Sequence, residues 1–214
     1  MDRTVVPFRS HFFSTPSGRL HYVDEGAGPP MVLLHGNPTS GYSFRRVVLG
    51  LRDGYRCLAT DLLGFGRSEK PQEAPYAPSA YAKRIGHWLE SVAERPVTLL
   101  AQDWGGPIAL DWATRNPDRV RALVILNSWA WSVRGDPHFE AFSRIMGGPL
   151  GRLLIRRLNV FVRVLIPVMS CGRISSAVLR YYQNALGSPS ERTACARFPG
   201  AVIGVSDWLA EIES

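Results

Sequence analysis

Short apolar segments, each ending in glycine or a small polar residue, recur between residues 31 and 127. MVLLHG, YRCLATDLLGFG, VTLLAQDWGG and RALVILN have this form. Between them, SAYAKRIGHWLESVAE and GGPIALDWATRNPDRV space their apolar residues as helices packed on a sheet do, and the second stops near Asn116-Pro117. Apolar strands that alternate with helices predict a parallel sheet covered by helices on both faces.

The segment that precedes this pattern predicts a hairpin. HFFSTPSGRLHYVDEGAGPP contains two short strand-like runs around the turn Pro16-Ser17-Gly18. We therefore expect the α/β fold class, with a doubly wound and mostly parallel sheet. Ligands of such sheets bind at the carboxyl ends of the strands. Asn37, Asp61 and Asp103 fall at those ends.

The strand pattern stops near Trp129, and helical stretches broken by Gly and Pro follow it. These stretches are HFEAFSRIM, LGRLLIRRLNVFVRVLI, RISSAVLRYYQNAL and SERTACARF. We interpret residues 1–128 as a core and residues 129–204 as a helical cap inserted after RALVILN. Residues 205–214, which include SDWLAEIES, predict the start of a helix that returns to the sheet.

Composition narrows the class of protein. With 214 residues and 45% hydrophobic content, the chain can bury one sizeable core. Cys57, Cys171 and Cys195 lack the close spacing of a disulfide framework or a zinc site, so we expect a reducing compartment, no metal and no cofactor. The start MDRTVVPFRS shows no basic region followed by an apolar run, which favours a cytoplasmic location.

The net charge of +7 comes almost entirely from arginine and is concentrated between residues 141 and 190, where no acidic residue occurs. Within this stretch, LLIRRLNVFVRVLIPVM is apolar but is interrupted by arginines, so it is a poor transmembrane span. We expect an amphipathic helix that covers a pocket, and contact with a membrane surface is the alternative. No nucleic-acid or membrane partner is expected.

The sharpest local signal is LLAQDWGGPIAL, a buried strand that breaks into a helix at Asp103. Hydrolases of this build carry serine at this turn, in G-x-S-x-G. Serine suits attack on an acyl carbon and needs a base to remove its proton, whereas a carboxylate is an anion already in place. A carboxylate is ionised near neutral pH, and a helix N-terminus favours its charged form. Asp103 is therefore the candidate nucleophile.

HGNPTSGYSFRRV, TDLLGFGRSEKP and AQDWGGPIALDWATRNPDRVRALVILN together resemble the haloalkane dehalogenases of the α/β-hydrolase superfamily. The resemblance implies an α/β-hydrolase fold with an inserted cap, and hydrolysis of a small haloalkane by water through an alkyl ester on Asp103. It also implies that the indole N–H of Trp104 and the side-chain amide of Asn37 bind the halide. Their backbone N–H groups would form the oxyanion hole.

Each of these residues has an ordinary structural reading as well. Asn37 suits a turn, Trp104 suits packing and Asp103 suits a helix N-cap. Their joint occurrence at strand ends favours function. His35 is read as a structural histidine that orients the oxyanion loop, and Asp61, Arg67 and Ser68 as residues that organise the loop after their strand.

Hydrolysis of the ester requires a histidine and an acid. In the family the histidine follows the last strand, but the five histidines here, His11, His21, His35, His87 and His138, do not occupy such a place. Asn127 stands where some relatives carry the acid. Asn37 and Asn127 together point to the third subgroup of the family, some of whose members self-associate, so a homo-oligomer is left open.

We therefore expect a truncated chain whose catalytic histidine and acid lie beyond Ser214. The last strands of the core would be missing, which leaves an uncovered sheet edge and a chain that cannot complete turnover.

Two other functions stay open from the sequence. An epoxide hydrolase also uses an aspartate nucleophile, and Tyr181-Tyr182 is the one adjacent tyrosine pair in the cap, although Asn37 argues against this activity. A non-catalytic binding protein on a hydrolase scaffold is the third reading. The substrate range is not fixed by the sequence, and the aromatic residues that could line a pocket or a core are Trp129, Trp131, Phe139, Phe142 and Phe161.

Overall fold

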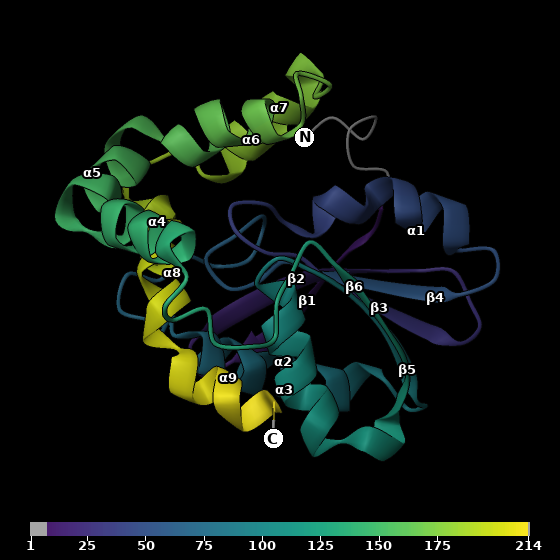
Figure 1. The fold of residues 1–214 in the computed structure, drawn as a ribbon. Coiled ribbons are helices and arrows are strands. Elements are labelled where there is room, and N and C mark those ends of the chain that lie inside the picture. Colours follow the sequence, from purple (N-terminus) through teal and green to yellow (C-terminus); the bar gives the residue numbers. More distant parts are fainter. Residues whose placement is uncertain (1–7, 214) are drawn as a thin grey trace.

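Residues 8–213 are described by the computed structural model, in which a mixed sheet forms the centre of the molecule (Figure 1). Its strands are β1 (Ser10–Thr15), β2 (Gly18–Glu25), β3 (Pro30–Leu34), β4 (Arg56–Thr60), β5 (Val97–Gln102) and β6 (Val120–Leu126). Within these residues the order across the sheet is β1-β2-β4-β3-β5-β6. The first three strands in this order pair antiparallel, and β4, β3, β5 and β6 run parallel. The predicted hairpin and parallel sheet are confirmed.

The central strands are covered on both faces. Every residue of β3 is buried, and because neighbouring side chains of a strand point to opposite faces, this requires a layer on each side. Figure 1 shows α1 (Arg45–Leu51) on one side of the sheet and α2 (Pro78–Val92) and α3 (Gly105–Arg115) on the other. The segments SAYAKRIGHWLESVAE and GGPIALDWATRNPDRV, which were predicted to be helices, correspond to α2 and α3. α1 was not predicted from the sequence, and Val48 is its one buried residue.

The regular elements after β6 are all helices within the described residues. They are α4 (Pro137–Gly147), α5 (Pro149–Leu158), a π-helical turn (Phe161–Leu165), α6 (Ile166–Met169), α7 (Ser176–Ala185), a short 3-10 turn (Ser190–Arg192), α8 (Thr193–Gly204) and α9 (Ser206–Glu213). The stretch expected to be one long helix divides at Asn159, which has a left-handed φ of 55°. Its side-chain amide donates to the carbonyl of Leu186 at 3.2 Å, which holds this break in place.

The last two helices return to the core. Phe198 of α8 is fully buried, and its ring lies 5.0 to 5.7 Å from those of Trp104, Tyr81 and Phe65. On α9, the indole N–H of Trp208 donates to Asp111 of α3 at 2.8 Å. The helix expected to return to the sheet is therefore present. Because α8 also packs on α4 and α5, the proposed boundary at residue 204 stays a prediction.

β6 is the edge strand of the described sheet. Its side chains Leu123, Val124, Ile125 and Leu126 are all exposed. Consecutive residues of a strand point to opposite faces, so both faces of β6 are open to solvent. The sheet edge is thus uncovered within residues 8–213, as the sequence led us to expect.

Candidate active site

Asp103 lies at the turn between β5 and α3 and has a positive φ of 54°. Few residues other than glycine adopt this conformation, and those that do cluster at functional sites. The backbone N–H of Asp103 donates to the carbonyls of Leu126 and Asn127 at 3.3 and 3.2 Å. The hydroxyl of Ser128 donates to the carbonyl of Asp103 at 2.6 Å. The segment after β6 therefore holds the turn in its strained shape.

Three glycines leave room for this turn. A Cβ on Gly36 would lie 2.0 Å from a carboxylate oxygen of Asp103, and one on Gly106 would lie 1.9 Å from the Ser128 hydroxyl. A Cβ on Gly105 would lie 2.2 Å from the carbonyl oxygen of Leu34 in β3. The glycines thus allow α3 to start directly against the central strand.

Gly105→Ala is expected to lower the free energy of unfolding by about 3 kcal/mol, because the new methyl group meets backbone rather than a movable side chain. Gly50→Ala is the matched control, since Gly50 lies on a helix with no atom within 4 Å of the added carbon. That change should be neutral or stabilise by about 0.5 kcal/mol. Urea denaturation of both variants measures the difference, and equal stability of the two would contradict the close approach.

The Asp103 carboxylate is buried and accepts backbone hydrogen bonds. The N–H of Asn37 donates to its Oδ1 at 2.7 Å, and the N–H of Trp104 also donates to the carboxylate. Burial raises the pKa of Asp103 to about 6, against the lowering effect of these two N–H groups. The position of Asp103 at a helix N-terminus predicts a further preference for the charged form. Desolvation is the larger effect, although a group with this pKa is still mostly ionised at pH 7.

Asn37 and Trp104 frame the carboxylate. The side-chain Nδ2 of Asn37 donates to the carbonyl of Cys195 on α8 at 3.2 Å. Trp104 is almost fully buried, and its ring lies 4.9 Å from that of Trp129 and 5.0 Å from that of Phe198. The structure therefore brings Asn37, Asp103 and Trp104 together in an apolar setting. α3 has no side-chain cap, which speaks against Asp103 as an ordinary N-cap.

His35 fits the structural role expected from the sequence. Its ring is fully buried; Nδ1 donates to the carbonyl of Gly36 at 2.8 Å, and Nε2 accepts the backbone N–H of Leu62 at 2.9 Å. These roles require the neutral ring, and burial lowers the pKa of His35 accordingly. The histidine thus joins the loop that carries Asn37 to the loop after β4.

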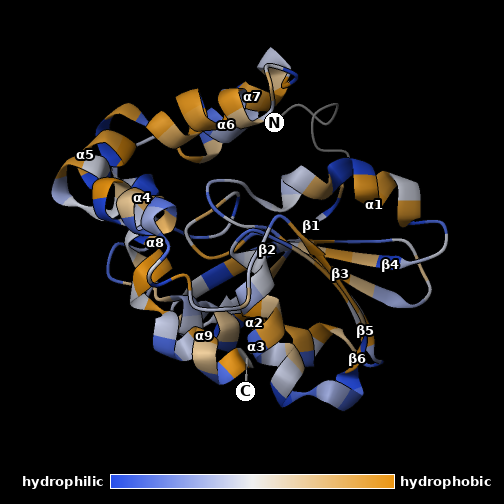
Figure 2. Ribbon diagram, in the orientation of Figure 1, coloured by the Kyte–Doolittle hydropathy of each residue, from blue (hydrophilic) through white to orange (hydrophobic). Residues whose placement is uncertain are grey.

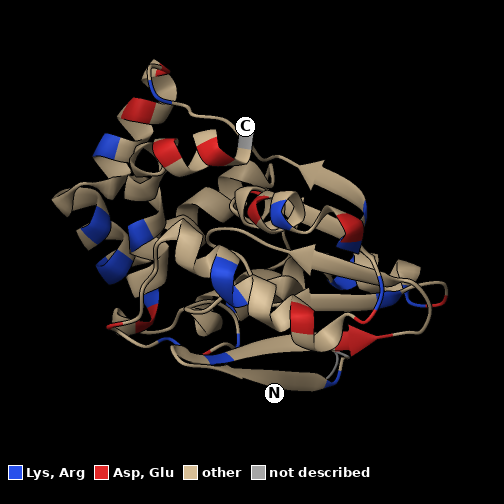
Figure 3. Ribbon diagram, turned by 90° about the horizontal axis from the view of Figure 1, so that it is seen from below, with Lys and Arg blue, Asp and Glu red and all other residues tan. Residues whose placement is uncertain are grey.

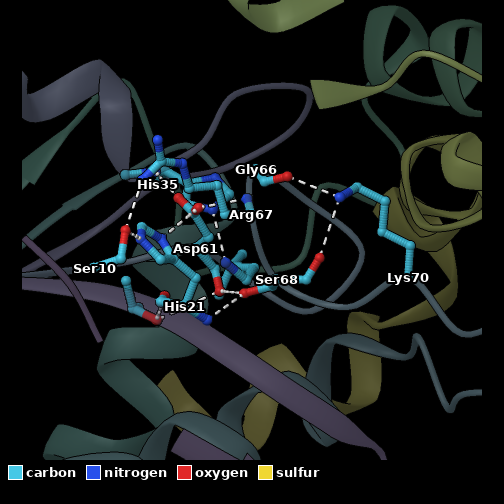
Figure 4. Close-up of polar contacts among 11 residues, drawn as sticks. Ser10, His21, His35, Asp61, Gly66, Arg67, Ser68 and Lys70 are labelled. Carbon is cyan, nitrogen blue, oxygen red and sulfur yellow. Dashed lines mark hydrogen bonds and ion pairs between the residues drawn. The ribbon is translucent and has the colours of Figure 1, made fainter. Parts of the chain in front are cut away.

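Asp61 organises a second buried network (Figure 4). Its carboxylate accepts the backbone N–H groups of Gly41 and Arg67, each at 2.7 Å, and pairs with His21 Nδ1 at 2.9 Å. Burial acts to raise the pKa of Asp61, but the hydrogen bond and charge of His21 and the backbone N–H of Arg67 hold it below its usual value. Ser68 donates to the carbonyl of Asp61 at 2.6 Å. These contacts fit the expected role of Asp61, Arg67 and Ser68 in shaping the loop.

The histidines of residues 8–213 make their hydrogen bonds and ring contacts elsewhere than at Asp103. No histidine ring in this part of the chain has a hydrogen bond or ring contact with Asp103, Trp104 or Asn37. His21 instead pairs with Asp61 and with the hydroxyl of Ser10 at 3.0 Å. The described residues also contain no group of three or more His, Cys, Asp or Glu that could hold a metal ion. No helix among them is long and apolar enough to cross a membrane.

The tyrosine pair of the cap lies away from the nucleophile's aromatic neighbours. Tyr181 packs at a tilt against Tyr42 with ring centroids 3.9 Å apart, and Tyr182 meets the same ring edge-on at 5.8 Å. Tyr181 also borders a cavity of about 20 Å³ that His21 and Asp61 line. Burial raises the pKa of both tyrosines. The pair therefore packs against the helical turn after β3, an arrangement that does not favour the epoxide reading.

The other cap aromatics have mixed environments. Phe161 is buried and stacks on Phe142 at 6.4 Å, whereas Trp131 and Phe139 are exposed. Trp129 is half-buried against Trp104, and its indole nitrogen is buried without a hydrogen-bond partner among the described residues. Of the five aromatic residues singled out in the sequence, Trp129 is thus the one packed on a candidate halide-binding side chain.

Comparison with known proteins gives concordant results. The α/β hydrolase fold family model matches residues 29–151. Haloalkane dehalogenase 2 of Mycobacterium tuberculosis H37Rv is 39% identical over 211 residues, which cover 99% of this chain and 73% of that protein. A cis-3-alkyl-4-alkyloxetan-2-one decarboxylase of Shewanella oneidensis is 35% identical over 74% of this chain and 51% of its own. The crystal structure of a haloalkane dehalogenase from Agrobacterium tumefaciens C58 superposes with a TM-score of 0.86 at 29% identity, covering 99% of this chain and 76% of that chain.

Proposed function

The chain belongs to the haloalkane dehalogenases of the α/β-hydrolase fold family, and on that basis we propose that Asp103 displaces halide from a haloalkane. In this step a carboxylate oxygen of Asp103 attacks the carbon that bears the halogen. The carbon–halogen bond breaks, the halide leaves with the bonding electrons, and an alkyl ester remains on Asp103. The observation that carries the proposal is a buried carboxylate at a strained strand-to-helix turn, bounded by Asn37 and Trp104.

The backbone N–H of Asn37 distinguishes the two carboxylate oxygens of Asp103. Oδ1 accepts the Asn37 N–H at 2.7 Å, which stabilises negative charge on that atom and lowers its reactivity. We infer that Oδ2 attacks and that Oδ1 becomes the carbonyl oxygen of the ester. The backbone N–H of Asn37 would then already point at the atom that becomes an oxyanion during hydrolysis.

Two side-chain donors would stabilise the departing halide, which is costly to form in an apolar setting. They are the indole N–H of Trp104 and the side-chain amide of Asn37. An amide has two N–H groups, and the carbonyl of Cys195 accepts one of them at 3.2 Å. That bond fixes the amide plane and leaves the second N–H for the halide.

Trp104→Phe and Asn37→Ala are each expected to slow halide displacement by about a hundredfold, the usual cost of removing one donor to a developing charge. Both substitutions keep the backbone N–H groups. Trp112→Phe is the matched control, because Trp112 is also buried but lies on the helix face toward α2. Single-turnover bromide release measures the rates. A Trp104→Phe rate equal to that of the control would exclude the indole as a halide donor.

The second half of the reaction needs a base that activates water. Within residues 8–213 no histidine lies against Asp103, so we propose that these residues perform displacement but do not hydrolyse the ester. Incubation with 1-bromobutane is expected to release about one bromide per chain. It should also leave one butyl group on the peptide that contains Asp103, detectable by mass spectrometry.

Reaction with 1-bromobutane and with 1,2-epoxyhexane separates three alternative outcomes. Sustained release of many bromides per chain would show that the ester is hydrolysed and would overturn the single-turnover proposal. Formation of a diol from 1,2-epoxyhexane, without reaction of 1-bromobutane, would favour an epoxide hydrolase. No reaction with either compound in a folded sample would favour a non-catalytic binding protein.

A further inference from the structure

The helices of the cap carry several exposed apolar side chains between residues 150 and 169. Leu150 is 67% exposed, Val168 68% and Met169 75%, and Leu153, Leu158 and Val164 are each more than half exposed. Figure 2 shows hydrophobic residues, in orange, along the ribbon from α5 to α6. Soluble proteins rarely expose so many large apolar groups in one short stretch. The segment was expected to cover a pocket with its apolar side, but these six residues face solvent.

The geometry of α5 separates a buried side from an exposed one. Gly151 and Ile155 are the buried residues of this helix. At 100° per residue, Leu150 and Leu153 lie on the opposite side, with Arg157 between them. Arg152 and Arg156 lie along one edge of this strip, on the side of Leu153. We refer to Leu150, Leu153, Leu158, Val164, Val168 and Met169, with Arg152, Arg156, Arg157 and Arg163, as the cap ridge.

The charge of the cap ridge is of one sign. No Asp or Glu occurs between residues 141 and 190, and within the described chain none of the four ridge arginines forms an ion pair. Figure 3 shows blue segments on the helices at the left of the view, with red segments on neighbouring helices above them. Arg152, Arg156 and Arg157 also line a groove of about 590 Å³ next to Pro189. The guanidinium groups that line it are suitable donors to phosphate oxygens.

The charge and the apolar side chains of the cap ridge indicate which kind of partner it can bind. Apposition of two copies through the ridge would bring arginines against arginines, which is unfavourable. A partner of the cap ridge must therefore carry anionic groups that contact the guanidinium groups. It must also carry an apolar layer that contacts the leucine side chains. An anionic lipid bilayer offers both, because headgroup phosphates overlie acyl chains.

We propose that the cap ridge binds the surface of membranes that contain anionic phospholipid, with α5 lying in the plane of the headgroups. Leu150 and Leu153 enter the boundary between headgroups and acyl chains, and the arginines bind phosphates above it. The inference does not depend on the proposed catalytic function. It replaces our expectation of no membrane partner with the alternative that the sequence had left open.

Sedimentation of the full chain with phospholipid vesicles tests the proposal. Binding is expected to vesicles that contain phosphatidylglycerol, to increase with the phosphatidylglycerol fraction, and to weaken in high salt. Vesicles of phosphatidylcholine alone should bind far less. The triple variant Arg152→Gln/Arg156→Gln/Arg157→Gln is expected to lower the partition coefficient by about a hundredfold, roughly fivefold per arginine. Leu150→Gln should lower binding at unchanged charge.

Matched variants separate the ridge from general cationic attraction. Arg46→Gln/Arg95→Gln/Arg134→Gln removes the same charge from exposed positions outside the cap ridge, and Leu49→Gln changes an exposed leucine of α1. Both should bind like the parent chain, and urea denaturation confirms that each variant is folded. Equal loss of binding in the ridge and control triples would overturn the proposal, as would absence of binding to phosphatidylglycerol. Concentration-dependent self-association that Leu150→Gln abolishes, without vesicle binding, would instead identify a contact between copies and also overturn it.

Discussion

Asp103→Asn is expected to abolish halide displacement and, above pH 7, to raise the free energy of unfolding by about 3 kcal/mol. The pKa of Asp103 is about 6 in the folded chain, against 3.8 for an ordinary aspartate. The folded state therefore holds this proton more tightly than the unfolded state does. The stabilising contribution is complete below pH 3.8 and is lost as pH rises through about 6. At neutral pH the folded chain thus carries the cost of a buried charge, which asparagine does not have.

Urea denaturation of the parent and Asp103→Asn chains at pH 4 and pH 8 measures this effect. The stability difference should be near zero at pH 4 and largest at pH 8. Asp111→Asn provides the matched control, because Asp111 is also buried but pairs with Arg115 and accepts the Trp208 indole N–H. That substitution should destabilise by about 1 kcal/mol. A stability gain in Asp111→Asn, or none in Asp103→Asn, would contradict the assigned cost of burial.

The rate of halide displacement is expected to fall about tenfold for each pH unit below about 6, because only the ionised carboxylate attacks and the pKa of Asp103 is about 6. Above pH 7 the rate should be constant. Burial has a compensating benefit, since a carboxylate that binds a proton more tightly is also a stronger nucleophile toward carbon. The rate should therefore reach its plateau just above the pKa of Asp103.

Single-turnover bromide release between pH 4.5 and 8.5 checks this profile. Intrinsic tryptophan fluorescence over the same range shows that the chain stays folded. Asp61 adds no inflection in this window, because the pKa of its carboxyl is held below the usual value by His21 and Arg67. A rate that is independent of pH down to 4.5 would show that Asp103 is not the group that titrates.

Much of the site could be predicted from the sequence because its residues lie at the ends of clearly marked strands. Parallel strands place their carboxyl ends side by side, so HGNP and QDWGG had to meet, and Asn37 contacts Asp103 as expected. Membership of the third subgroup rests on Asn37 and Asn127 alone and stays a prediction.

Properties set by tertiary packing were not available from local patterns. The pKa of Asp103 depends on how completely Trp104 and the residues around it exclude water. The break at Asn159 depends on the carbonyl of Leu186, which lies 27 residues away. The contact of Asn37 with Cys195 joins residues 158 apart and was not expected. The direction in which Leu150 and Leu153 point follows from which side of α5 meets the rest of the cap.

The bond from Asn37 to the carbonyl of Cys195 makes the cap a part of the halide site that we propose. α8 sets the angle of the amide, so a shift of this helix by one hydrogen-bond length would turn the free N–H away from the halide. A movement of α8 that loosens the cap would then also lower the affinity for halide. A chloride-binding constant would consequently serve as a gauge of cap closure, and any ligand that moves α8 would change the rate at which halide leaves.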